Sequence, residues 1–152
     1  PQGQWATAAK ASSSYGSANT AGADSQDGYA PWQATGAPNG ESWSNNSQDI
    51  GFDWLELNFA TPVAATEVRV VTSARESAES ISKVELIASD GTAHTAWSGL
   101  SDTKRDERGA RSWIVRKFDA TPYTVKAVKV TFANNVSSGY KTVDAVQLIG
   151  IK

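Results

Sequence analysis

The sequence predicts an all-β protein, a β-sandwich of jelly-roll type with about eight strands. Three observations predict this fold class. Apolar and polar residues alternate in short runs, which Gly, Pro and Asn separate from one another. A pattern at residues 61–70 recurs at 121–130, a spacing of 60 residues. No stretch keeps the apolar period of an amphipathic helix.

The repeated pattern begins with Thr-Pro in both copies and follows an aromatic residue, Phe59 or Phe118. Each copy continues into an alternation of valine, a cation and valine. Proline fixes φ and removes a donor from the strand ladder, so we expect Pro62 and Pro122 each to end one strand. The repeat therefore predicts two matching strand–corner–strand units, and we expect the loops after both units to meet at one end of the sandwich.

The expected strands follow from alternation with a period of two residues. Leu55, Leu57 and Phe59 should face the core, and Val128 and Phe132 repeat this pattern later in the chain. Residues 89–92, Ser-Asp-Gly-Thr, predict the turn of a hairpin over 82–97. The strands expected in chain order are 4–12, 54–59, 66–73, 82–88, 93–97, 111–118, 126–133 and 142–149.

Residues 13–53 form a long polar stretch without a strand pattern, and 100–109 form a shorter one. Segments of this length in a compact domain are usually functional, ion-bound or disordered. The first stretch carries Tyr15, Tyr29, Trp32 and Trp43, whereas disordered linkers are poor in aromatic residues. We therefore expect an ordered loop packed by these rings, with Trp43 serving mainly as an anchor.

Composition limits the classes of protein that remain. A chain of 152 residues fits a single domain, 1–152. It has no Cys, so no disulfide is available. It also has no Met, even at position 1, so we expect a piece excised from a larger protein. The net charge of −2 argues against a nucleic-acid partner. No apolar run approaches the roughly 20 residues of a transmembrane helix. We expect a monomer.

Catalytic patterns are missing from the sequence. The single histidine, His94, lies in the middle of an expected strand, and no Gly-x-Ser-x-Gly, His-Glu-x-x-His or P-loop motif occurs. We therefore predict that the chain is not an enzyme.

Four segments resemble the discoidin, or coagulation factor 5/8 type C, family, which has the galactose-binding-like fold. These segments are Ala8 to Ser13, Gln33 to Trp43, Trp54 to Leu57 and Val143 to Gly150, so the resemblance runs nearly end to end. They are similar to family 32 carbohydrate-binding modules of bacterial extracellular proteins. The resemblance implies a secreted or cell-surface location and a ligand site on loops at one end of the sandwich.

The resemblance also suggests which residues bind a sugar. Arg75 matches the family's arginine after the third strand segment, Tyr140 matches the aromatic of the last loop, and Glu76 lies beside Arg75. Asn45 and Asn46 stand where many relatives place a histidine, and its absence argues against galactose. Aromatic faces stack on sugar C–H groups, while guanidinium and amide groups bind hydroxyls. The alternative is that the charges are solvated and Tyr140 packs on the sandwich.

Trp32 and Tyr29 are candidates for a second stacking platform, if they are exposed. If they are buried, they simply hold the long loop in place.

The resemblance further implies a structural Ca²⁺ near the loop before Trp43. The family's usual aspartate is Gly36 here, so the candidate ligands are Asn39, Asp144 and Asp27. Ca²⁺ takes six to eight oxygen ligands, a mixture of carboxylates and carbonyls. The alternative is a loop closed by hydrogen bonds and Asx turns.

The predicted function is non-catalytic carbohydrate binding, which would tether a larger extracellular protein to a polysaccharide or glycoconjugate. The first alternative is a structural or protein-interaction module of a bacterial surface protein without a sugar site. A further alternative is binding to an anionic surface through Arg105, Arg108 and Arg111, although such a run is more often solvated.

Overall fold

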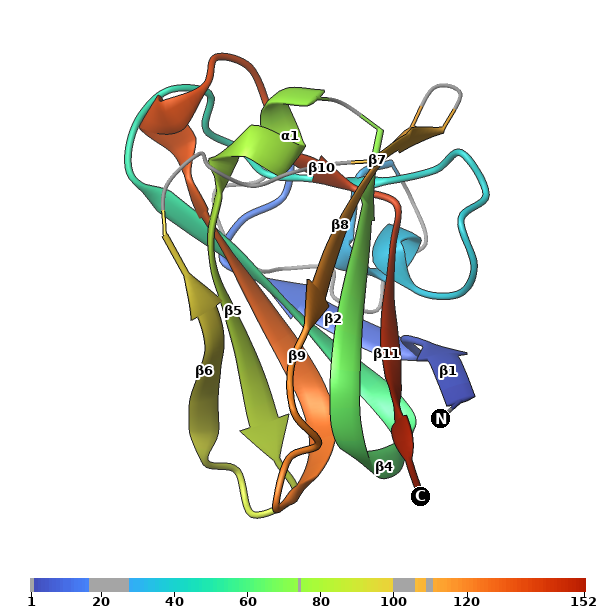
Figure 1. The fold of residues 1–152 in the computed structure, drawn as a ribbon. Coiled ribbons are helices and arrows are strands. Elements are labelled where there is room, and N and C mark those ends of the chain that lie inside the picture. The colour runs from blue at the N-terminus through green and yellow to red at the C-terminus, as the bar shows by residue number, and fades with distance from the viewer. Residues whose placement is uncertain (1, 17–27, 74, 100–105, 109–110) are drawn as a thin grey trace.

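Two antiparallel β-layers pack face to face in the computed structural model of the chain, which describes residues 2–16, 28–73, 75–99, 106–108 and 111–152 (Figure 1). One layer holds β1 (Gln2–Trp5), β11 (Ala145–Ile151), the second half of β4 (Phe52–Thr72), β8 (Arg111–Lys117) and β7 (Asp106–Arg108). The other holds β2 (Ala8–Ala11), the first half of β4, β9 (Thr124–Ala133), β5 (Ile81–Ala88) and β6 (Ala93–Ser98). The predicted β-sandwich is confirmed.

Short elements gather at one end of the sandwich, the upper end in Figure 1. Helix α1 follows β4, and the two-stranded ladder of β3 and β10 lies beside it. We call this region, with the loops 45–52 and 134–141, the loop end. Its elements are η1 (Pro31–Ala34), β3 (Trp43–Ser44), α1 (Arg75–Ser80), η2 (Asn134–Val136) and β10 (Thr142–Val143).

Strand β4 belongs to both layers. Its first half pairs with β2 and β9, and its second half pairs with β11 and β8. The expectation that Pro62 separates two strands is therefore wrong. Pro62 is exposed where the register with β9 is interrupted between Asn58 and Val63, so its missing N–H costs no ladder bond.

The second copy of the Thr-Pro pattern does separate two strands, as predicted, because β8 ends at Lys117 and β9 begins at Thr124. The two copies also contact each other. Thr121 N donates to Ala65 O at 3.0 Å, and Ala65 N donates to Thr121 Oγ1 at 2.9 Å. The repeat thus marks a place where the connection between β8 and β9 is hydrogen-bonded to β4.

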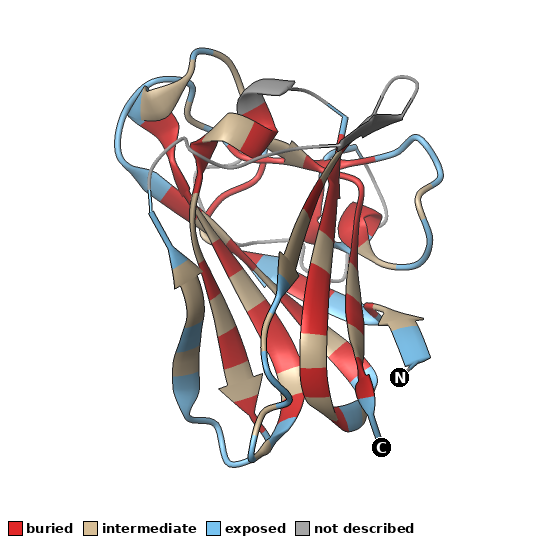
Figure 2. Cartoon of the chain, viewed as in Figure 1, coloured by how far each residue is buried: buried red, intermediate tan, exposed pale blue. Residues whose placement is uncertain are grey.

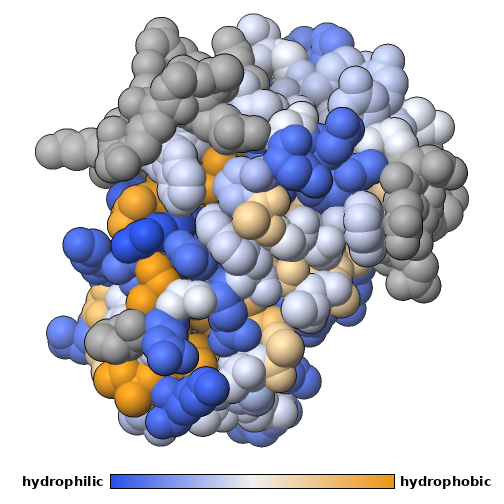
Figure 3. Space-filling view, turned by 90° about the vertical axis from the view of Figure 1, so that its right-hand side faces the viewer, coloured by the Kyte–Doolittle hydropathy of each residue, from blue (hydrophilic) through white to orange (hydrophobic). Residues whose placement is uncertain are grey.

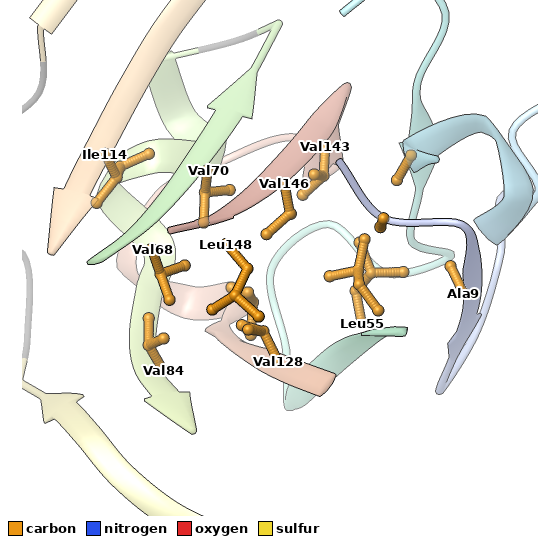
Figure 4. Packing of buried hydrophobic residues seen from close by; sticks show 14 of the residues in the cluster. Ala9, Leu55, Val68, Val70, Val84, Ile114, Val128, Val143, Val146 and Leu148 are labelled. Carbon is orange, nitrogen blue, oxygen red and sulfur yellow. The ribbon is translucent and has the colours of Figure 1, made fainter. Parts of the chain in front are cut away.

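The core lies between the layers and consists of the side chains that alternation predicted. Leu55 and Leu57 are fully buried, as are Val128, Val130 and Phe132. Figure 2 shows buried residues alternating with partly exposed ones along the strands, and Figure 4 shows Val68, Val84, Val128 and Leu148 packed across the gap. Full burial of such a side chain contributes roughly 1.5–3 kcal/mol.

Further details differ from the sequence expectation. The segment predicted as one strand over 142–149 is two strands, β10 and β11, which pair with β3 and β4. The segment predicted as one strand over 4–12 is two strands, because the chain crosses from β11 to β4 between them: Ala6 N donates to Val146 O, and Thr7 N to Asn58 O. Helix α1 was not expected. Its Ser77, Ala78 and Ser80 are buried against neighbouring segments, so packing stabilises a helix too short to form by propensity alone.

The opposite end of the molecule consists of tight connections, and we call it the turn end. The hairpin of β5 and β6 is closed as predicted, with Gly91 N donating to Ala88 O at 2.8 Å and Asp90 Oδ1 accepting from Thr92 N at 2.9 Å. Gly91 has a φ of 92°, which favours glycine.

Among the described residues, no helix is long and apolar enough to cross a membrane.

Candidate functional site

Three tyrosines lie together near the loop end, and we call them the tyrosine face. Tyr15 contacts Tyr29 with ring centroids 5.3 Å apart and Tyr140 at 4.9 Å, both nearly perpendicular. Edge-to-face geometry is favourable because the positive ring edge meets the negative ring face. Tyr15 and Tyr29 are each 49% exposed, and Tyr140 is partly exposed, so the group presents aromatic surface to solvent.

The segment Trp43 to Asn46 positions all three rings. Tyr15 N donates to Ser44 O at 2.8 Å, and Ser44 N donates to Tyr29 O at 3.2 Å. Asn45 N donates to the carbonyl of Lys141, the residue after Tyr140, at 3.0 Å. Trp43 anchors this segment as predicted, since it is fully buried and its indole N–H donates to Ser13 O at 2.9 Å.

A buried polar network lies among the segments that carry these tyrosines. Asp53 is its acceptor: Oδ1 accepts from the hydroxyls of Ser12 and Ser13, and Oδ2 accepts from the amides of Asn45 and Asn134. The four distances lie between 2.6 and 3.0 Å. A buried carboxylate is tolerated when its oxygens are hydrogen-bonded in this way.

The structure brings together three of the predicted ligand-binding residues. Tyr29 and Tyr140 both contact Tyr15, and the exposed Asn46 accepts from Gly16 N at 3.1 Å through its side-chain oxygen. Asn46 N also donates to Ser13 Oγ at 3.0 Å, so this amide lies beside the segment that carries Tyr15.

Asn45 occupies a different environment from the one predicted. It is fully buried, its Nδ2 donates to Asp53 and Asn134, and its Oδ1 accepts from Lys141 N at 2.8 Å. These internal bonds occupy both ends of the amide, so Asn45 cannot reach a sugar hydroxyl. Asn45 and Asn46 are neighbours in sequence, but only one of them faces solvent.

Trp32 is 37% exposed on η1 and takes no part in the ring contacts that join the three tyrosines. Arg75 and Glu76 begin α1, and their side chains lie outside the described part of the structure. The helix itself lies where the repeat predicted, because Ser80 hydrogen-bonds Ser137 and Ser77 Oγ accepts from Thr142 N. The loops after the two Thr-Pro copies therefore do meet at one end.

Two of the three predicted calcium ligands, Asn39 and Asp144, lie within the described residues. Asn39 is exposed, and its Oδ1 accepts from Glu41 N at 3.0 Å, which closes an Asx turn. Asp144 is buried between β10 and β11, and Asp27 lies outside the described residues. Within the described ranges, no group of three or more His, Asp or Glu residues could hold a metal ion. Calcium stays a prediction.

Sequence reasoning missed three residues that shape this site: Tyr15 as a member of the face, and Asp53 and Lys141 as buried polar residues near it. Tyr15 had a recognisable signal, since it is an aromatic residue in the same polar stretch as Tyr29. Asp53 and Lys141 had no such signal, because the groups that their side chains bind lie up to 93 positions away in the chain.

A cavity of about 470 Å³ opens away from the loop end, beside the chain termini, and is lined by Gln2, Gln4, Thr61, Val63, Gly150 and Ile151. On the face that Figure 3 draws, apolar residues gather in the lower part, and the described residues of the upper part are mainly polar. The cavity contains none of the tyrosines.

Solved structures with the same fold cover almost the whole chain. A chitosan-binding module derived from a chitosanase/glucanase of Paenibacillus sp. IK-5 has a TM-score of 0.64 at 16% identity, covering 95% of each chain. The family 32 module of AlyQ, in complex with 4,5-unsaturated mannuronic acid, has a TM-score of 0.65 at 17% identity and 98% coverage of both chains.

The family 32 module of Clostridium perfringens NanJ, in complex with galactose, has a TM-score of 0.64 at 16% identity, covering 97% of this chain and 98% of that one. These likenesses confirm the predicted fold, which is that of family 32 and related carbohydrate-binding modules. No family model and no curated protein matches the sequence. The three neighbours bind different sugars, so the shared fold does not name a ligand.

Proposed function

We propose that this chain is a non-catalytic carbohydrate-binding module that tethers a larger secreted or cell-surface protein to a polysaccharide or glycoconjugate. The observation that carries the proposal is the tyrosine face, where three half-exposed rings from separate segments meet at one place. The carbohydrate-binding modules that share the fold support the same class of ligand.

Recognition would combine stacking with hydrogen bonds. The exposed ring surfaces of Tyr29 and Tyr140 would pack on the C–H faces of sugar rings, held by Tyr15 between them. Asn46 lies beside Tyr15 and its Nδ2 group would donate to hydroxyls. Arg75, at the start of the neighbouring α1, would supply a guanidinium group.

A shallow aromatic surface of this kind binds weakly. A dissociation constant of about 10⁻³ to 10⁻⁵ M corresponds to roughly −4 to −7 kcal/mol. A single weak site tethers effectively when other modules of the same protein bind the same polymer, because linkage raises the effective concentration. We therefore propose a monomeric module that acts together with other domains of its parent chain.

A glycan array followed by calorimetry tests the proposal. Wild-type protein should bind at least one neutral, acidic or amino polysaccharide, and Tyr15→Ala or Tyr140→Ala should weaken binding by about tenfold, or 1.4 kcal/mol. Arg75→Ala should weaken binding without changing stability. Repeating the assay and the melting curve with a chelator tests calcium, since loss of a structural ion lowers Tm.

Tyr123→Leu is the matched control, because Tyr123 stacks on His94 at the turn end, with ring centroids 4.0 Å apart. It removes a partly buried tyrosine far from the tyrosine face and should leave glycan binding unchanged. Failure of the wild type to bind any glycan would contradict the proposal. Equal losses of glycan affinity in Tyr123→Leu and Tyr140→Ala would show that the tyrosine face is not the binding site.

A second candidate function, a protein-interaction module, is favoured by one observation. Ile50 and Phe52 are 72% and 71% exposed at the loop end, unusually high for large apolar side chains. An Ile50→Ser/Phe52→Ser double variant should keep glycan binding if the first proposal holds. Loss of a co-purifying partner domain with unchanged glycan binding in this variant would support the second candidate.

A further inference from the structure

Lys141 carries a charged group inside the loop end. Its side chain is fully buried, and its three N–H donors are shared among four backbone carbonyls, those of Gln48 at 2.7 Å, Asn134 at 3.1 Å, Ser137 at 2.9 Å and Gly139 at 2.5 Å from Nζ. Burying an ammonium group is costly unless hydrogen bonds replace its water. Oxygen atoms surround this nitrogen much as they surround a bound cation.

The four acceptors come from two loops that are far apart in sequence. Gln48 belongs to the loop 45–52, and the other three acceptors belong to the loop 134–141. Backbone carbonyls repel one another when they converge without a cation between them. The ammonium group therefore stabilises an arrangement in which both loops turn their carbonyls inward.

Tyr140 lies directly between two of the positions that this arrangement fixes. On one side, Gly139 O accepts from Lys141 Nζ, with a Gly139 φ of 91° that favours glycine. On the other side, Lys141 N donates to Asn45 Oδ1, and Lys141 O accepts from Asn45 N. With its backbone held on both sides, Tyr140 keeps its ring against Tyr15.

We propose that Lys141 is the positioning residue of the tyrosine face, whose ammonium group acts as an internal cation that joins the two loops and orients Tyr140 for a ligand. This inference rests on the proposed function for its consequence in binding, although the positioning itself does not depend on any ligand. The cation between these two loops is thus supplied by the chain itself.

Nuclear magnetic resonance on Lys141→Met tests the positioning role. This substitution keeps the length of the side chain but removes the donors. We expect the nuclear Overhauser effect between the Tyr15 and Tyr140 rings to disappear, while the indole N–H signal of Trp43 stays and reports an intact core. Glycan affinity should fall by about tenfold. Lys117→Met, which removes an exposed lysine on β8, is the charge-matched control and should change neither readout.

The outcome that overturns the inference is a folded Lys141→Met protein that keeps the Tyr15–Tyr140 effect. If the variant does not fold, wild-type protein decides: a slowly exchanging Lys141 ammonium signal close to the Gly139 and Ser137 signals is expected, and its absence overturns the inference. A wild type that binds no glycan would contradict the proposed function only. The Tyr15–Tyr140 measurements would still test the positioning role of Lys141.

Discussion

The loop end and the turn end of this sandwich are held by different kinds of interaction. At the turn end, the hairpin turn is closed by contacts between residues close in sequence, such as Asp90 with Thr92 and Ala88 with Gly91. At the loop end, the carboxylate of Asp53 and the ammonium of Lys141 are buried and bind groups from distant segments. The comparison teaches that irregular loops can be as precisely built as strands when buried polar groups replace the ladder.

Removing the centre of the loop-end network should have the largest effect. Asp53→Ala would leave hydroxyl and amide donors from four residues without their acceptor in a buried place. We expect a loss of about 3–5 kcal/mol in the free energy of unfolding, measured by urea denaturation. Asp49→Ala removes the same charge from an exposed position and should cost about 0.5 kcal/mol or less. Similar losses for both variants would show that the network does not stabilise the loop end.

Two glycines outside the loop end, Gly3 and Gly150, should differ in how well they tolerate substitution by alanine. A Cβ at Gly150 would clash with the backbone carbonyl of Ala64, where the register of β11 shifts, so Gly150→Ala should destabilise by about 1–3 kcal/mol. A Cβ at Gly3 would approach Gln147 Nε2 at 2.5 Å, but that side chain can move away. Thermal melting should therefore place Gly3→Ala closer to the wild type than Gly150→Ala.

The smallest effect is expected in the hairpin turn. The hydrogen bond from Thr92 N lowers the pKa of the exposed Asp90 below its usual value of 3.8. Because the folded-state pKa is the lower one, Asp90 adds stability above pH 3.8, and this contribution is lost as the pH falls through the folded-state pKa. The small difference in Tm between wild type and Asp90→Ala should therefore disappear in strong acid. A difference that persists there would assign the effect to turn geometry rather than to charge.

The sequence carried enough information to predict the strands but not the loop-end network. Alternation placed Leu55, Leu57 and Phe132 in the core because a strand exposes its two faces to different surroundings over a few neighbouring residues. The hairpin at Asp90 and Gly91 was predictable for the same reason, since turn chemistry is local. These features depend on residues that are adjacent in the chain.

The roles of Asn45, Asn46 and Lys141 depend on distant partners instead. Asn45 and Asn46 are chemically identical, yet one bonds Asn134 in the interior and the other lies in solvent. Lysine is rarely fully buried, so nothing in the composition around Lys141 indicates that its ammonium group would lie inside. The resemblance to a known fold predicts a ligand site on loops at one end of the sandwich but could not supply these pairings.

The course of β4 through both layers also has a consequence for how the chain folds. Its second half pairs with β11, and β11 in turn pairs with β1, so residues 2–5 reach the sheet through a strand near the other end of the chain. Pairings between such distant segments form slowly, because closing the long loop between them loses chain entropy before the stabilising contacts have formed. Pulse-labelling hydrogen exchange during refolding should show the amides of β1 and β11 gaining protection together, after those of the β5–β6 hairpin.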